Sequence, residues 1–177
     1  MAKDLTTFYL EDPIFVDANV LEGDFPDKPF AANCKYFLKR IEDGHINAAT
    51  SVQCINEALY RRLISVGIAI LKPSVKDKAK KVRGQIEKDG IFAKDCYSEV
   101  KIFLDYLLQL HRKGLQIIDY ILNHQVETVD LAIAYGLTFN FTDATYLHIC
   151  MAEGINHIAT SDGNFERNPF GFEIWKP

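Results

Sequence analysis

The chain has 177 residues, of which 48% are hydrophobic and 25% are charged, and its net charge is −4 at neutral pH. This length suits a single domain, and the composition is that of a globular protein rather than a disordered or collagen-like one. The net negative charge excludes a general attraction to nucleic acids, so binding of RNA or DNA would need a local basic patch or metal ions.

The sequence gives no sign of a membrane or secreted protein. Its longest apolar stretch, residues 63–71, is far shorter than the ~20 residues that a membrane-spanning helix needs. Residues 1–13 contain several acids and lack the apolar core of a signal peptide. The cysteines are far apart and form no C-x-x-C pair, which favours small buried hydrophobes over a zinc site or a disulfide framework. We therefore expect a cytoplasmic protein with no membrane partner.

The first half of the chain alternates short apolar runs with amphipathic segments. Residues 14–16 are fully apolar, as is typical of a strand buried on both faces. A helix is predicted from the N-cap candidate Asp27 to Gly44, because apolar residues recur there with helical spacing. Residues 45–50 have the character of a second short strand. Ser51 then caps a helix whose apolar face extends to Val66.

The second half begins with an inserted pair of helices at about residues 74–113. Ser74 and Asp77 form a capping box for the first, and Gly90 separates it from the second, predicted at 95–111. The remaining predicted elements are strands at 115–118, 156–160 and 172–175 and helices at 125–135 and 142–153, the last with Thr142 as N-cap and a hydrophobic staple of Phe141 and Tyr146. Strands that alternate with helices predict an α/β fold with a mostly parallel sheet covered on both faces.

Acidic side chains follow the predicted strands at the places where parallel sheets bind ligands. Such sites lie beyond the carboxyl ends of the strands, and Asp17 and Asp162 each come directly after a strand. Asp143 lies in the first turn of its helix, on the same stripe as apolar residues, and so points inward. The alternatives are turn formation by the two strand-end acids and a helix-dipole interaction by Asp143. Glu57 lies opposite the main apolar stripe of its helix, so its spacing alone favours a solvated residue.

Four sequence segments resemble, in their usual order, the signature of PIN domains. They are IFVDANVL at residues 14–21, NE at 56–57, TDATYL at 142–147 and TSDGNF at 160–165. The resemblance spans about residues 14–175. It implies a three-layer α/β/α fold, with residues 14–177 as one nuclease domain and 1–13 as an N-terminal leader. It also implies a metal-dependent endoribonuclease, a type that includes the toxins of many VapBC-type toxin–antitoxin pairs.

By the same resemblance, four acids become the metal-binding and catalytic residues: Asp17, Glu57, Asp143 and Asp162. Asn19 and Thr160 become supporting polar residues. Oxygen-only ligands favour Mg²⁺ or Mn²⁺ over zinc, and such an ion can activate water for attack on a phosphodiester. The resemblance implies an RNA substrate, with an antitoxin protein and a second copy of the chain as candidate protein partners. Asn164 stands where many members have a further acid, and the inserted helices make the chain longer than compact toxins of the family.

Two other classes of function remain open from the sequence. A haloacid-dehalogenase-like phosphatase also has an aspartate after its first strand, but that family requires a second aspartate where this chain has Asn19. A PIN fold that is catalytically weak could serve as an RNA-binding or protein-interaction module. Separately, the basic run from Lys72 to Arg83 is either a solvated helix face or an RNA contact, with Lys76, Lys80 and Arg83 as a candidate stripe.

Overall fold

The computed structural model describes residues 2–23, 29–72, 77–119 and 141–177, and its centre is a six-stranded sheet. Every strand pair is parallel, in the order β1-β6-β5-β2-β3-β4. The strands are β1 (Lys3–Asp4), β2 (Ile14–Val16), β3 (Ala48–Ser51), β4 (Leu115–Ile118), β5 (His157–Ala159) and β6 (Glu173–Lys176). The parallel sheet is confirmed, and only the short edge strand β1, within the predicted leader, was not anticipated.

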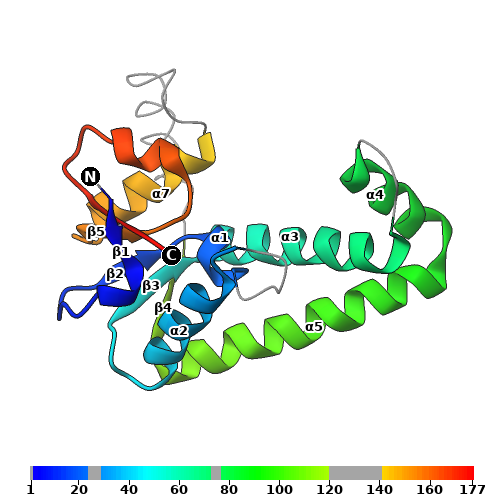
Figure 1. Cartoon of the computed structure of the whole chain (residues 1–177), viewed down its shortest axis with the longest axis horizontal. Coiled ribbons are helices and arrows are strands. Elements are labelled where there is room, and N and C mark those ends of the chain that lie inside the picture. The colour runs from blue at the N-terminus through cyan, green and yellow to red at the C-terminus, as the bar shows by residue number, and fades with distance from the viewer. Residues whose placement is uncertain (1, 24–28, 73–76, 120–140) are drawn as a thin grey trace.

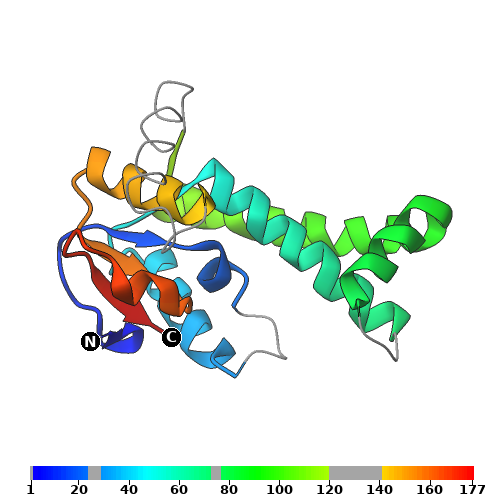
Figure 2. The same ribbon diagram turned by 90° about the horizontal axis from the view of Figure 1, so that it is seen from above.

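Helices cover both faces of this sheet (Figures 1 and 2). The α-helices are α1 (Ala18–Leu21), α2 (Ala31–Glu42), α3 (Val52–Leu71), α4 (Lys78–Lys88), α5 (Gly90–Lys113) and α7 (Phe141–Ala152), and the 3₁₀ helices are η1 (Leu5–Thr7) and η2 (Gly163–Arg167). Helices α2 and α5 lie on one face of the sheet and α7 on the other (Figure 1). The fold is therefore three-layered, α/β/α, as expected.

Several helix boundaries differ from the sequence prediction for local reasons. Ser51 caps α3 as predicted, since its Oγ accepts a hydrogen bond of 3.1 Å from the backbone N–H of Cys54. Helix α5 begins earlier than predicted, at Gly90, because the Asp89 carboxylate accepts hydrogen bonds from two backbone N–H groups of its first turn. Thr142 is not an N-cap, since α7 begins one residue before it. The short helix α1 was missed.

Some predicted features lie outside the described residues. They are the N-cap candidate Asp27, the capping-box residue Ser74, the stripe residue Lys76 and the helix at 125–135. Asp77 is the residue before α4, and its side chain makes no capping hydrogen bond. The predicted pair of inserted helices is otherwise confirmed, as α4 and α5.

The core has a large part and a small part. The large cluster lies between the sheet and its helices and includes three of the four cysteines, all four of which are buried and free. The small cluster consists of Val66, Val82, Phe92 and Cys96 and lies away from the sheet, where α3, α4 and α5 meet. We call this region the arm: α4 with residues 63–71 of α3 and 90–99 of α5 (Figures 1 and 2). None of the helices described is long and apolar enough to cross a membrane.

The sheet reverses its direction of growth at β2. The chain runs from β2 to β3 and β4 on one side, and then returns to place β5 and β6 on the other side. In open parallel sheets, ligands bind at such a switch point, in the crevice beyond the carboxyl ends of the strands. Here the crevice lies where β2 and β5 end, next to Asp17 and Thr160.

Candidate active site

Asp17 lies at the centre of this crevice. It follows β2 directly, its backbone N–H donates to the carbonyl of Ala159 at 3.0 Å, and it precedes α1 as the N-cap residue. Only 4% of its surface is exposed. Its side chain makes no capping hydrogen bond to α1, although the adjacent backbone N–H of Ala18 favours the charged carboxylate and lowers its pKa. The contacts of Asp17 therefore give the turn-forming interpretation little support.

The two predicted supporting residues hold the Asp17 carboxylate. Thr160 Oγ1 donates to Asp17 Oδ2 at 2.6 Å, and Asn19 Nδ2 donates to the same oxygen. Asn19 also donates to Thr160 Oγ1 at 3.1 Å, and its Oδ1 accepts from the backbone N–H of Ser161 at 2.8 Å. This network joins the loops after β2 and β5, and it leaves one carboxylate oxygen of Asp17, Oδ1, outside these bonds.

The surroundings of Asp17 disfavour its charge. The pKa of Asp17 is raised to about 6. Burial is the main cause and the negative charge of Glu57 adds to it, while the hydrogen bond from Thr160 and the charge of Arg61 offset part of the increase. Burial also raises the pKa of the neighbouring Cys54 thiol to about 12. The thiol therefore stays protonated and offers no thiolate nucleophile beside the carboxylate.

Glu57 is half-buried and paired, so the spacing-based expectation of a solvated residue is wrong. Tyr146 of α7 donates its hydroxyl to Glu57 Oε2 at 2.7 Å. Arg61, one turn further along α3, donates its Nε to Glu57 Oε1 at 2.9 Å. The second contact is an ion pair, and Asp17 and Glu22 add to the negative field at Arg61. Burial lowers the pKa of Arg61, but these three acids outweigh it and raise that pKa overall.

The other two predicted acids have different settings. Asp143 is buried, with 6% of its surface exposed, and it lies one helical turn before Tyr146 on α7. Asp162 is half-exposed, and its Oδ1 accepts from the backbone N–H of Asn164 at 2.8 Å, which caps η2. Its own N–H donates to Thr160 Oγ1 at 3.0 Å. The inward orientation of Asp143 is confirmed, and Asp162 has the turn-forming contact that the alternative interpretation predicts.

The donor set fits a hard divalent cation in its chemistry. Asp17, Glu57 and Asp143 bring carboxylate oxygens, and the nearby sulfur, Cys54, remains a thiol. In the arrangement of the described side chains, however, no three acidic, histidine or cysteine residues are grouped so that they could hold a metal ion. Arg61 instead supplies positive charge beside Glu57.

Sequence reasoning missed three residues of this region: Glu22, Arg61 and Tyr146. Glu22 is fully buried at the end of α1, and Ser65 of α3 donates to its Oε1 at 3.2 Å. Glu57, Arg61 and Ser65 are spaced by four residues, so a polar stripe on α3 was visible in the sequence. Only the folded chain shows that this stripe faces α1 and α7.

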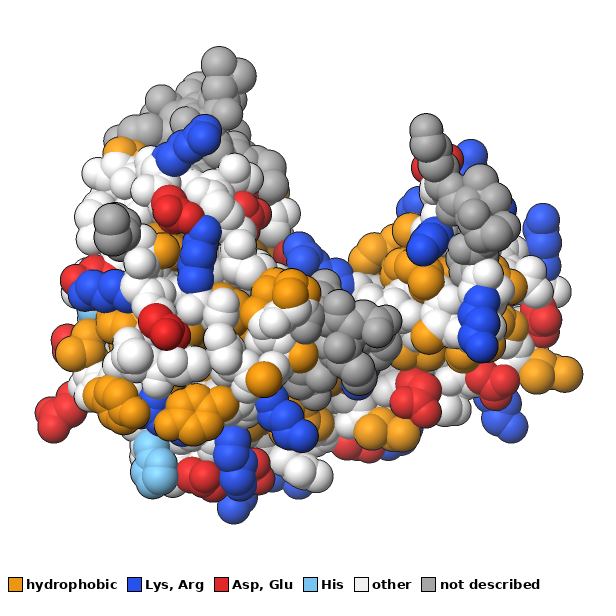
Figure 3. Space-filling view, in the orientation of Figure 1, with side chains coloured by type: hydrophobic (Ala, Val, Ile, Leu, Met, Phe, Trp, Pro, Cys, Tyr) orange, Lys and Arg blue, Asp and Glu red, His pale blue; other side chains and the backbone are white. Residues whose placement is uncertain are grey.

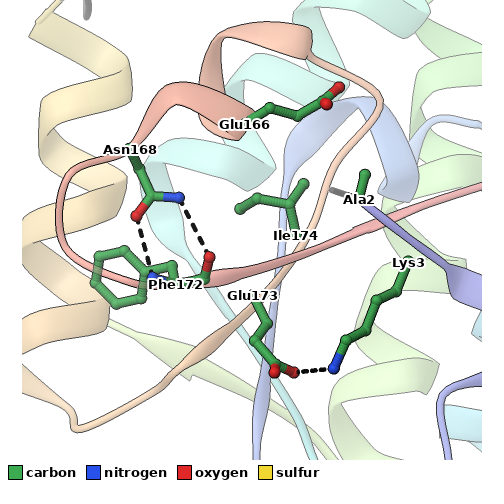
Figure 4. A pocket seen from close by; sticks show the side chains of 7 residues that line it. All are labelled: Ala2, Lys3, Glu166, Asn168, Phe172, Glu173 and Ile174. Carbon is green, nitrogen blue, oxygen red and sulfur yellow. Dashed lines mark hydrogen bonds and ion pairs between the residues drawn. The ribbon is translucent and has the colours of Figure 1, made fainter.

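A separate pocket of about 200 Å³ lies beside β1 and β6 (Figure 4). Lys3 forms an ion pair of 2.7 Å with Glu173 at its side. Asn168 closes the neighbouring loop by donating to the carbonyl of Phe172 at 3.2 Å and accepting from its N–H at 3.0 Å. None of the predicted site residues lines this pocket, whose polar groups serve to join the edge strand and the loop.

Comparisons with known proteins identify the fold. No family model and no curated protein matches the sequence. The crystal structure of VapBC2 from Rickettsia felis, bound to a DNA fragment from their promoter, aligns with a TM-score of 0.53 at 17% identity, covering 93% of this chain and 98% of that one. VapC20 from Mycobacterium tuberculosis, a Sarcin-Ricin loop cleaving toxin, aligns at 0.49 and 12% identity, over 86% and 92%. FitAcB from Neisseria gonorrhoeae aligns at 0.42 and 13%, over 92% and 95%.

The first of these alignments carries the assignment. It covers nearly the whole of both chains. The protein has the PIN-domain fold of VapC-type proteins, which the ordered motifs in its sequence indicate independently.

Proposed function

We propose that this protein is a metal-dependent endoribonuclease that hydrolyses RNA phosphodiester bonds at the carboxyl edge of its sheet. The observation that carries the proposal is the buried Asp17 carboxylate at the switch point, held by Asn19 and Thr160 and coupled to the charge of Glu57. Burying this carboxylate is expensive even with the charge of Arg61 nearby, because its pKa stays raised, and a purely structural role would not require it. The PIN-like fold adds support, because parallel sheets bind ligands at the edge next to which Asp17 and Thr160 lie.

Within this proposal, Asp17, Glu57, Asp143 and Asp162 hold Mg²⁺ or Mn²⁺. The bound ion would screen the charge of the phosphate and lower the pKa of a water molecule for in-line attack. Asn19 and Thr160 fix the Asp17 side chain through its Oδ2 and leave Oδ1 for the ion. Tyr146 fixes Glu57 from the opposite helix, and burial raises the pKa of its hydroxyl, which keeps it a proton donor to that carboxylate.

One observation favours a second candidate, the catalytically weak binding module. The Arg61 guanidinium is already ion-paired with Glu57, so the acids have a countercharge from the protein itself. If that pair were permanent, the site would need no metal. The chain would then bind RNA or another protein through its surface without cleaving phosphodiesters.

A protein partner is also part of the proposal. The fold is shared with VapBC2, and an antitoxin-type protein is the partner that we propose for this chain. In that case the protein acts as the toxin of a toxin–antitoxin pair in the cytoplasm. A homodimer is the second assembly that we propose to test, by light scattering of the purified chain with and without the product of a neighbouring gene.

The deciding experiment measures RNA cleavage for each combination of metal condition and protein variant. Structured and unstructured RNAs are incubated with Mn²⁺, Mg²⁺ or EDTA, and with wild-type protein or Asp17→Asn. We expect cleavage only with a metal. The variant should lose more than about a hundredfold in rate, since loss of outer residues that merely orient a metal ligand already costs about 10–100-fold. Cleavage that persists in EDTA and in the variant would refute the proposal, and absence of cleavage under all conditions would favour the binding module.

A further inference from the structure

Helix α4 carries a concentrated positive surface in a protein whose net charge is negative. Its 11 residues include only one acid, Glu87, and five cations: Lys78, Lys80, Lys81, Arg83 and Lys88. All five cationic side chains are exposed. Within the part of the chain that the structure describes, none of them forms an ion pair. Their charge is therefore available to a partner.

The outward face of α4 is built around a glycine. Lys80, Lys81 and Lys88 line a hollow of about 560 Å³ together with Gly84, Gln85, Asp77 and Leu71. Gly84 leaves the floor of this hollow open, since a Cβ built there would have no neighbour within 4 Å. Lys81 and Lys88 are two helical turns apart and share one face of the helix, and Lys80, the neighbour of Lys81, lines the same hollow from the side. A backbone of phosphates could contact all three.

The inward face of α4 fixes this surface in place. Val82 is fully buried and packs against Gly67 of α3 so closely that a Cβ at Gly67 would lie 2.3 Å from Val82 Cγ1. Phe92 and Cys96 of α5 complete this small core. Since α4 is packed against two longer helices, its cations have a defined position relative to the sheet.

The positive surface is within reach of a ligand bound at the candidate active site. Leu71, at the edge of the hollow, lies fourteen residues beyond Glu57 on the same continuous helix, which is about 21 Å at 1.5 Å per residue. Figure 3 shows a concavity between the lobe that carries α7 and the lobe that carries α4, and Lys and Arg side chains gather on the second lobe. An extended polyanion could therefore contact both places.

We propose that α4 binds the sugar–phosphate backbone of RNA while another part of the same RNA reaches the carboxyl edge of the sheet. This inference rests on the proposed nuclease function. RNA is favoured over an acidic protein because a phosphodiester chain is the one ligand that suits both the cationic hollow and a metal-binding hydrolytic site. Lysine contacts to phosphates give affinity without sequence specificity, so α4 should dock RNA rather than select its sequence.

The test compares two variants with the same change in charge. Lys80→Gln/Lys81→Gln/Lys88→Gln removes the three cations of the hollow. Lys94→Gln/Arg112→Gln/Lys113→Gln removes three exposed cations of α5 and is the matched control. Binding of a fluorescent RNA is measured in EDTA, so that no cleavage occurs, across a range of salt concentrations. Thermal melts of both variants check folding, and Lys→Arg at the same three α4 positions should retain binding.

If the hollow binds phosphates, the slope of log affinity against log salt should fall by about 2 in the α4 variant. Its affinity should fall by about a hundredfold at 0.1 M salt, while the control changes only a few-fold. An equal loss in both variants, or no loss in either, would overturn the inference. The inference would also be overturned if the α4 variant lost binding to a polyglutamate peptide but still bound RNA. That result would indicate an acidic protein as the partner.

The two proposals fail in different ways. If the wild type cleaves RNA and the α4 variant binds it equally well, the nuclease function stands and the docking role of α4 is refuted. If no RNA is cleaved but binding depends on α4, the docking role stands and the nuclease function is refuted.

Discussion

The sheet edge and the arm treat charge in opposite ways. At the sheet edge, Asp17 is buried, and the hydrogen bonds from Thr160 and Asn19 compensate only part of its lost hydration, since its pKa stays raised. On the arm, the cations of α4 remain in water, where each costs little to keep. The sheet edge therefore keeps the Asp17 charge at the expense of folding stability. The arm, in contrast, can gain or lose charges with almost no effect on folding.

The largest effect is expected from Asp17, whose pKa is raised from its ordinary value of 3.8 to about 6 in the folded state, chiefly by burial. At about pH 3 and below, the carboxyl is mostly protonated in both states. As the pH rises to neutrality, the unfolded chain loses the proton more readily, so wild-type stability falls by about 3 kcal/mol. Asp17→Asn removes this penalty and keeps an oxygen for the two donors that share Oδ2.

Urea unfolding at several pH values measures this prediction. The stability of the Asp17→Asn protein relative to wild type should rise from near zero at about pH 3 to about 3 kcal/mol at pH 7.5. Asp95→Asn, on the exposed surface of α5, is the matched control and should give no such rise. A variant that is less stable than wild type at neutral pH would show that the Asp17 charge stabilises the fold.

A smaller effect should distinguish the stability of the arm from that of the central sheet. Gly67→Ala would push α4 away from α3 through Val82, at a cost of about 1–3 kcal/mol that a gain in helix propensity of up to about 1 kcal/mol offsets in part. We expect faster amide exchange in residues 78–88, with the strands unchanged. Val82→Ala in the same chain should restore protection by making room. Equal acceleration of exchange in residues 78–88 and in the strands would mean that the arm and the sheet unfold together.

The sequence predicts the elements of both regions well, because their apolar spacing is regular. Strands β2 and β4 have the predicted bounds, and on α7 the positions Asp143, Leu147 and Cys150 are buried as their spacing indicates, whereas Met151 of the same stripe is exposed. The two-residue strand β1 and the four-residue helix α1 were missed because such short elements have no measurable period. Their existence depends on pairing with β6 and on the turn after Asp17.

The candidate site was predictable only as a set of residue types at strand ends. The setting of Glu57 depends on Tyr146, which is 89 positions away in the sequence, and no periodicity in either helix indicates that contact. Arg61 was within reach of prediction, since an acid and a base four residues apart on a helix tend to pair. That such a pair would lie beside Asp17 follows only from the packing of α3 against α1.

The smallest effect on stability, and the sharpest test of the site, concerns Asp162. Its carboxylate caps η2, so Asp162→Ala should cost about 1 kcal/mol of stability, as loss of a helix cap does. Asn is an equally good cap, and Asp162→Asn should melt within about a degree of the wild type without metal. If Asp162 also holds the cation, the melting temperature of the wild type should rise by several degrees with Mn²⁺ at 100 times its Kd, since such binding stabilises by about 2.7 kcal/mol. The Asp162→Asn protein should gain much less. An undiminished Mn²⁺ shift in that variant, with a loss only in Asp162→Ala, would assign Asp162 to the structure of the turn and leave Asp17, Glu57 and Asp143 as the ligands to test.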